Sequence, residues 1–119
     1  MNQRTYDRTH ASQLVPMLRS IMTEILERTG EIETLEARLE TRLQDRATAS
    51  RDHDATQLRA QIAEHRRQMR LSTRELARFG CAIDQDHPAR VLIPGETGEL
   101  MRGYRWSPLD EELTPAGAQ

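Results

Sequence analysis

The chain has 119 residues, of which 36% are hydrophobic, 3% aromatic and 30% charged, and its net charge at pH 7 is −2. This composition fits one domain of long exposed helices with a small compact part, and it excludes a large globular core. The net charge provides no bulk attraction to nucleic acid, and the single cysteine excludes an internal disulfide. No apolar run reaches the roughly 20 residues that span a bilayer, so a cytoplasmic protein without membrane insertion is predicted.

A first helix is predicted over residues 8–47, with Asp7 as its N-cap. Pro16 removes one backbone donor and predicts a kink near residues 12–16. Gly30 disfavours a helix by about 1 kcal/mol, but the apolar pattern continues through it in phase. One long helix is therefore predicted, and a helix that is split at Gly30 stays open as the alternative. The apolar positions recur every three or four residues and are Leu14, Leu18, Ile21, Ile25, Ile32, Leu35 and Leu39.

Residues 48–54 are polar without periodicity and are predicted to form a loop. A second helix is predicted over residues 55–79, and Gly80 follows it where a left-handed C-cap belongs. His65 lies on the apolar side of this helix, where we expect a polar layer that fixes the register rather than a metal ligand. The apolar positions of the second helix are Leu58, Ile62, Met69, Leu76 and Phe79.

The two predicted helices match each other when the chain folds back antiparallel. Residues 24–45 hold seven acids and three arginines, whereas residues 55–79 hold six arginines and two acids. These opposite charges favour pairing of the two helices over pairing of either helix with itself. We therefore predict a mainly α fold with a long antiparallel two-helix coiled-coil hairpin. The facing pairs are Leu43 with Leu58, Leu39 with Ile62, Ile32 with Met69, Ile25 with Leu76, and Met22 with Phe79.

A small C-terminal β-hairpin is predicted to follow within residues 81–106. Residues 90–93 form a β-like run, residues 94–98 read as a plain turn rather than a phosphate cradle, and residues 100–106 alternate apolar and polar side chains. Its apolar face is expected to pack on Leu14, Val15 and Leu18 of the first helix. Residues 107–119 contain two prolines and several acids and are predicted to be a flexible tail.

The opening segment TYDRTHASQLVPMLRSIMTEI resembles the domain of unknown function 2203 family of small bacterial proteins. Shared features follow near the C-terminus, in Phe79-Gly80, in residues 86–89, in Gly95-Glu96, and in Tyr104 and Trp106. The resemblance implies a helical hairpin with a β-hairpin, and it implies no established activity. The features of the opening segment are Tyr6, Asp7, Ala11, Leu14, Pro16 and Leu18.

The residues that could carry chemistry form no catalytic or metal-binding pattern. No two histidines have the spacing of a zinc motif. Cys81 and His87 could be neighbours at the corner after the second helix, but a thiol nucleophile also needs an orienting third group. Cys81 as a small buried hydrophobe is the preferred interpretation. No catalytic residue, metal site or cofactor is predicted.

Contacts with a protein partner are the preferred interpretation of the surface. Four off-seam apolar residues, Leu26, Ala60, Ala63 and Leu71, predict that two hairpins pair into a four-helix dimer. The expected function is that of a non-enzymatic structural or adaptor protein, as a homodimer or a small subunit of a larger assembly. The alternative is an accessory factor that binds RNA, the ribosome or RNA polymerase. The candidate contact residues are the arginine ridge Arg66, Arg70, Arg74 and Arg78, the acidic hairpin tip Asp45, Asp52 and Asp54, and Trp106.

Overall fold

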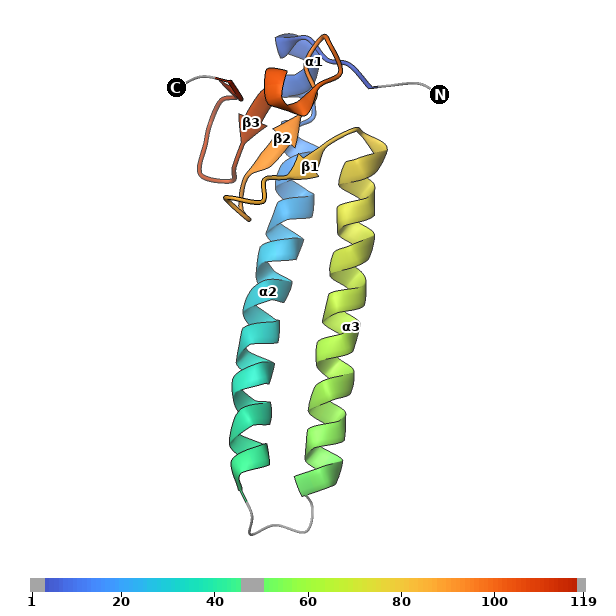
Figure 1. The fold of residues 1–119 in the computed structure, drawn as a ribbon, viewed down its shortest axis with the longest axis vertical. Coiled ribbons are helices and arrows are strands. Elements are labelled where there is room, and N and C mark those ends of the chain that lie inside the picture. The colour runs from blue at the N-terminus through green and yellow to red at the C-terminus, as the bar shows by residue number, and fades with distance from the viewer. Residues whose placement is uncertain (1–3, 46–50, 118–119) are drawn as a thin grey trace. The chain divides into compact units, whose positions relative to one another are not determined.

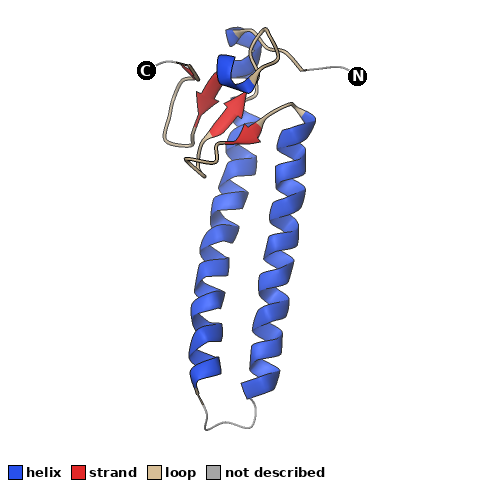
Figure 2. Cartoon of the chain, in the orientation of Figure 1, coloured by secondary structure: helices blue, strands red, loops and turns tan. Residues whose placement is uncertain are grey.

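The computed structural model describes residues 4–45 and 51–117, which are mainly helical and end in a small antiparallel sheet (Figures 1 and 2). The chain forms two compact units. We call Ile25–Leu71 the helix-pair unit, and Met1–Glu24 with Ser72–Gln119 the sheet unit. The elements are α1 (Arg8–Gln13), α2 (Val15–Gln44), α3 (Arg51–Arg78), β1 (Ala82–Ile83), β2 (Val91–Ile93), the 3₁₀-helix η1 (Leu100–Arg102), β3 (Tyr104–Trp106) and β4 (Thr114–Pro115).

The N-terminal end of the first predicted helix is a separate short helix. Asp7 is its N-cap, as predicted, and the Asp7 carboxylate accepts from the backbone N–H of His10 at 2.8 Å. This hydrogen bond lowers the pKa of Asp7. The prediction of one helix over residues 8–47 was wrong at Leu14, where α1 ends and α2 begins. Pro16 is the physical reason, because it has no N–H to continue the α-helical hydrogen bonds across this point.

Helix α2 runs without a break through Gly30, so the split at this residue is excluded. It ends at Gln44, and the last residues of the predicted helix, 46–47, lie outside the described residues. Helix α3 begins at Arg51 rather than at residue 55, so the second half of the predicted loop is helical. Acids in the first turn complement the helix dipole, which explains why the helix starts among residues that were assigned to a loop.

The C-terminal end of α3 follows the predicted capping pattern. Gly80 has a φ of +76°, which an L side chain rarely adopts. The N–H of Gly80 donates to the carbonyl of Ala77 at 2.9 Å, and the N–H of Cys81 donates to that of Leu76 at 3.0 Å. These two hydrogen bonds satisfy carbonyls that the helix leaves free.

The core of the helix-pair unit lies between α2 and α3, which pack side by side (Figure 1). Ile32 and Leu35 of α2 and Ile62 of α3 are buried, and Leu39, Leu58 and Met69 pack against them. All six residues belong to the predicted apolar seams. Leu43, which was predicted to face Leu58, is 47% exposed because it lies in the last turn of α2.

The sheet has four strands in the order β1-β2-β3-β4, and all three pairings are antiparallel. The predicted hairpin corresponds to β2 and β3, in which Val91 pairs with Trp106 and Ile93 with Tyr104. The predicted loop of about five residues was too short, because the connection covers residues 94–103. Residues 100–102 form η1 rather than a strand, so β3 is only three residues long.

Residues beyond Trp106 belong to the fold as far as they are described. Leu113 is buried, and β4 pairs with β3 through Arg105 and Thr114. Arg8 donates to the carbonyl of Leu113, and Arg19 donates to that of Pro108, both at 2.9 Å. The structure therefore differs from the predicted flexible tail over residues 107–117, because this segment supplies an edge strand and a core side chain.

Candidate interaction surface

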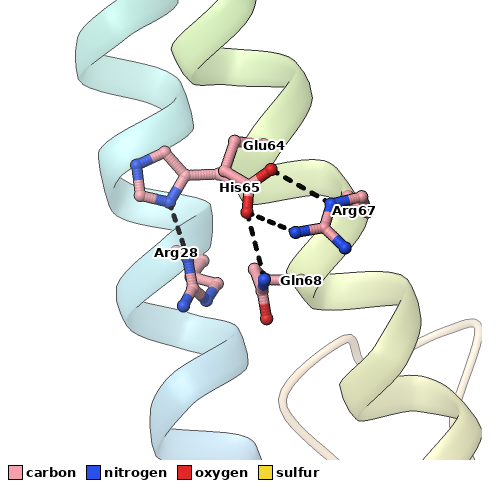
Figure 3. Close-up of polar contacts among 5 residues, drawn as sticks. All are labelled: Arg28, Glu64, His65, Arg67 and Gln68. Carbon is pink, nitrogen blue, oxygen red and sulfur yellow. Dashed lines mark hydrogen bonds and ion pairs between the residues drawn. The ribbon is translucent and has the colours of Figure 1, made fainter.

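A polar contact interrupts the apolar seam of the helix-pair unit (Figure 3). The guanidinium of Arg28, on α2, lies 3.0 Å from Nδ1 of His65, on α3. Because arginine only donates, Nδ1 of His65 is the acceptor in this contact. The side chains come from different helices and are both partly buried. His65 therefore lies in a polar layer, as the sequence predicted.

A second polar group lies on α3 alone (Figure 3). Arg67 donates to both carboxylate oxygens of Glu64 at 2.7 and 3.0 Å, and the side-chain amide of Gln68 donates to Glu64 at 3.1 Å. These donors lower the pKa of Glu64 to about 2, with the hydrogen bonds from Arg67 as the largest cause. Arg67, which is the sequence neighbour of the ridge residue Arg66, is therefore paired with an acid of its own helix.

The four ridge arginines differ in their contacts. Arg66 forms an ion pair with Glu36 of α2 at 3.0 Å, which is the predicted combination of an α3 arginine with an α2 acid. Arg70, Arg74 and Arg78 are exposed, and none of them has an ion-pair partner among the residues that the structure describes. Their guanidinium groups can offer bidentate hydrogen bonds to a carboxylate or phosphate.

The predicted acidic tip is only partly described. Asp54 forms an ion pair with Arg42 at 3.6 Å, so its charge is offset within the helix-pair unit. Asp45 follows the end of α2, and its backbone N–H donates to the carbonyls of Thr41 and Arg42, both at 3.2 Å. The side chain of Asp52 lies outside the described residues. The described part of the tip does not gather the acids into one cluster.

A groove of about 280 Å³ runs along one side of the helix pair. Apolar side chains and arginines line it together, and the sequence pattern alone did not indicate such a groove. Its lining residues are Glu36, Leu39, Arg59, Ile62, Ala63, Arg66 and Arg70. We call it the arginine groove. Among the described residues, Arg59, like Arg70, has no ion-pair partner.

A larger hollow of about 850 Å³ is lined by other residues of the same two helices. Asp54 and Arg42, which form an ion pair, are both in its lining. Threonines, glutamines, alanine and leucine supply much of the rest. This hollow therefore has fewer unpaired charges than the arginine groove. Its lining residues are Thr34, Ala37, Arg38, Thr41, Arg42, Asp54, Gln57, Leu58 and Gln61.

Trp106, which was a candidate contact residue, lies in the interior of the sheet unit. The side chain is 0% exposed, and the guanidinium of Arg19 lies over the ring at 5.0 Å from its centroid. A partner would not reach the indole in this structure. In the sequence, Trp106 ends an alternating run of apolar and polar residues, and this pattern is as compatible with a core position as with a contact residue.

Cys81 and His87 do not form a nucleophile–base pair in the structure. Cys81 is 4% exposed, and its thiol donates to the carbonyl of Phe79 at 3.8 Å. Burial raises the pKa of Cys81 to about 12. His87 is exposed in a turn, where its backbone N–H donates to the carbonyl of Asp84 at 3.2 Å. A thiol with this environment is protonated at neutral pH and is a poor nucleophile.

Cys81 is expected to be unreactive while the protein is folded. At pH 8 a colorimetric disulfide reagent should modify the thiol of the native protein at least about 100-fold more slowly than the same thiol in urea, because both burial and the raised pKa suppress the thiolate. The unfolded chain is the matched control. Equal rates in the two states would contradict the buried position of Cys81.

No group of three or more histidine, cysteine or acidic side chains within the described ranges could hold a metal ion. Among the same residues, no helix combines the length and apolar character that crossing a bilayer requires.

A family model described as "Uncharacterized conserved protein (DUF2203)" matches residues 4–112. This match covers most of the chain and confirms the family that the opening segment and the C-terminal features indicated. A search of curated proteins and a search of solved structures gave no match.

Proposed function

The chain belongs to the DUF2203 family of uncharacterized conserved proteins, and we propose that it is a non-enzymatic adaptor that works in the cytoplasm through protein–protein contacts. It acts as a homodimer or as a small subunit of a larger assembly. The arginine groove is the observation that carries this proposal. Its lining combines an apolar floor of Leu39, Ile62 and Ala63 with two arginines, Arg59 and Arg70, that have no ion-pair partner among the described residues.

The helix pair suits this role as an antiparallel coiled coil. The steps of three and four residues in both seams are typical of knobs-into-holes packing. Six seam residues join in one apolar cluster, which supports the register that was predicted from the sequence. A coiled coil of this kind presents long charged faces, on which a partner helix can find both apolar contacts and ion pairs.

An affinity capture from native cells tests the proposal. We expect the tagged chain to retain a protein partner that survives nuclease treatment and is lost from the triple variant Arg66→Ala, Arg70→Ala and Arg74→Ala. Arg38→Ala, in the larger hollow, is the control and should retain the partner. Retention of the same protein by the wild type and the triple variant would contradict a role for the arginines.

An accessory factor that binds RNA, the ribosome or RNA polymerase is the second candidate. Arg70, Arg74 and Arg78 favour it, because they are exposed, have no ion-pair partner in the described part of the chain, and can attract phosphates without any base-specific contact. In the sheet unit, Arg4 and Arg78 also line a hollow of about 760 Å³. Loss of the captured material after nuclease treatment, together with salt-dependent RNA binding, would favour this candidate over the first.

A further inference from the structure

The arginine groove is one part of a larger charged face of the helix-pair unit. Glu36 lines the groove from α2. Glu33 and Glu40 lie three residues before and four residues after it, so all three carboxylates project from the same side of the helix. On α3 the groove is lined by Arg59, Arg66 and Arg70. We call these six residues, with the apolar floor between them, the groove face.

The groove face has unpaired charges of both signs. Glu36 and Arg66 neutralise each other at 3.0 Å within the chain. Glu33, Glu40, Arg59 and Arg70 are exposed, and none has an ion-pair partner among the described residues. Two acids on α2 and two arginines on α3 are therefore left, in separate strips along neighbouring helices. This pattern is complementary to a surface on which an arginine strip faces the acids of α2 and an acidic strip faces the arginines of α3.

Apolar surface accompanies these charges. Leu26 is 39% exposed and Leu43 is 47% exposed. Leu26 lies seven residues before Glu33, and Leu43 lies seven residues after Glu36, so both leucines project from the acidic side of α2. With the floor of the groove, they provide apolar contacts along the length of the face. Leu71 is not part of the groove face, because it lies nine positions after Ile62 and therefore on the opposite side of α3 from that residue.

We propose that the groove face binds the groove face of a second copy of this chain. The inference rests on the proposed function, and it names the partner. The two hairpins point the same way about a two-fold axis parallel to the helices, so that α2 of each copy lies against α3 of the other. The acidic strip then meets the arginine strip twice. An axis perpendicular to the helices would instead place acid on acid and arginine on arginine.

The ion pair within the chain sets the register of this dimer. Contact between Arg66 and Glu36 places these two residues at about the same height along the hairpin. A two-fold axis parallel to the helices preserves that height. Arg70 of one copy then lies within about 1.5 Å, along the axis, of Glu33 of the other, and Arg59 lies within about 5 Å of Glu40. Both separations are within the reach of an arginine side chain.

Reversal of the charges on one strip at a time tests this arrangement. One variant combines Arg59→Glu with Arg70→Glu, and the other combines Glu33→Arg with Glu40→Arg. We expect the wild type to dimerise at micromolar concentration in sedimentation experiments. Each variant alone should associate about 100-fold more weakly, because four attractive pairs become repulsive. An equimolar mixture of the two variants should recover association, because the introduced glutamates of one variant then face the introduced arginines of the other.

Controls and contrary outcomes separate this inference from the proposed function. Arg38→Glu with Arg67→Glu makes the same change of net charge as Arg59→Glu with Arg70→Glu, but at residues outside the groove lining, and it should dimerise as the wild type does. Circular dichroism checks that every variant is folded. A monomeric wild type, or a mixture that stays monomeric, would overturn the pairing of two copies. If the monomer still captured a protein through Arg66 and Arg70, the proposed function would stand without it.

Discussion

Trp106→Ala is expected to lower the free energy of unfolding by about 3–5 kcal/mol. Trp106 has the largest fully buried side chain among the described residues, and it pairs across the sheet with Val91, which is also 0% exposed. Loss of the indole would leave a cavity between β3 and the elements that cover it. The guanidinium of Arg19 would also lose the ring beneath it. Denaturant unfolding that is followed by far-ultraviolet circular dichroism measures the effect.

Two further substitutions calibrate this loss. Trp106→Phe should cost less than Trp106→Ala, because the benzene ring keeps most of the packing. It also removes the indole Nε1, which is buried and has no hydrogen-bond partner among the described residues. Leu109→Ala should change the stability by no more than about 0.5 kcal/mol, because Leu109 is 95% exposed. If Trp106→Ala matched Leu109→Ala, the indole could not be a core residue.

The helices could be predicted because their signals are local and long. Apolar residues repeat over many turns, so one doubtful position such as Gly30 did not outweigh the rest. Gly80 lies two residues after the end of α3, where a short hydrogen-bonded motif fixes its role. The break at Leu14 was only half predicted. Pro16 indicated a kink, but propensity alone could not decide between a bent helix and two helices.

The sheet was harder to predict because its outer strands are very short. β1 and β4 contain two residues each, too few for an alternating pattern to be recognised. They form only because β2 and β3 offer backbone partners, and these contacts depend on tertiary structure. Residues 100–102 show the opposite problem. They continue the alternation of β3, but the structure folds them into a 3₁₀-helix.

The contact residues were predicted as a set, but their individual roles were not. Spacing by four residues placed the ridge arginines on one side of α3, and net charge favoured their pairing with α2. Only the structure shows that Arg66 forms an ion pair with an acid, whereas Arg70 forms none with the residues that the structure describes. Arg59 was missed because it stands apart from the ridge in sequence. Its spacing of seven residues from Arg66 is the signal that could have included it.

The connection between β2 and β3 leaves no room for a side chain at Gly103. A Cβ there would overlap the carbonyl oxygen of Ile93 and lie 2.6 Å from the backbone nitrogen of Gly95. Both atoms belong to the backbone, so rotation of a flexible side chain cannot relieve the clash. Gly103→Ala is therefore expected to destabilise the fold by about 3 kcal/mol or more, because β2 and η1 must move apart.

Gly30→Ala is the matched control, with the same added methyl group and the opposite expected sign. Gly30 lies inside α2 with nothing within 4 Å of the new Cβ, so alanine should stabilise the protein by about 1 kcal/mol through its higher helix propensity. Urea unfolding of both variants under one set of conditions measures the difference. A Gly103→Ala protein that unfolds at the same urea concentration as the wild type would show that the connection is looser than this structure. A loss of stability in Gly30→Ala would argue against a continuous helix at residue 30.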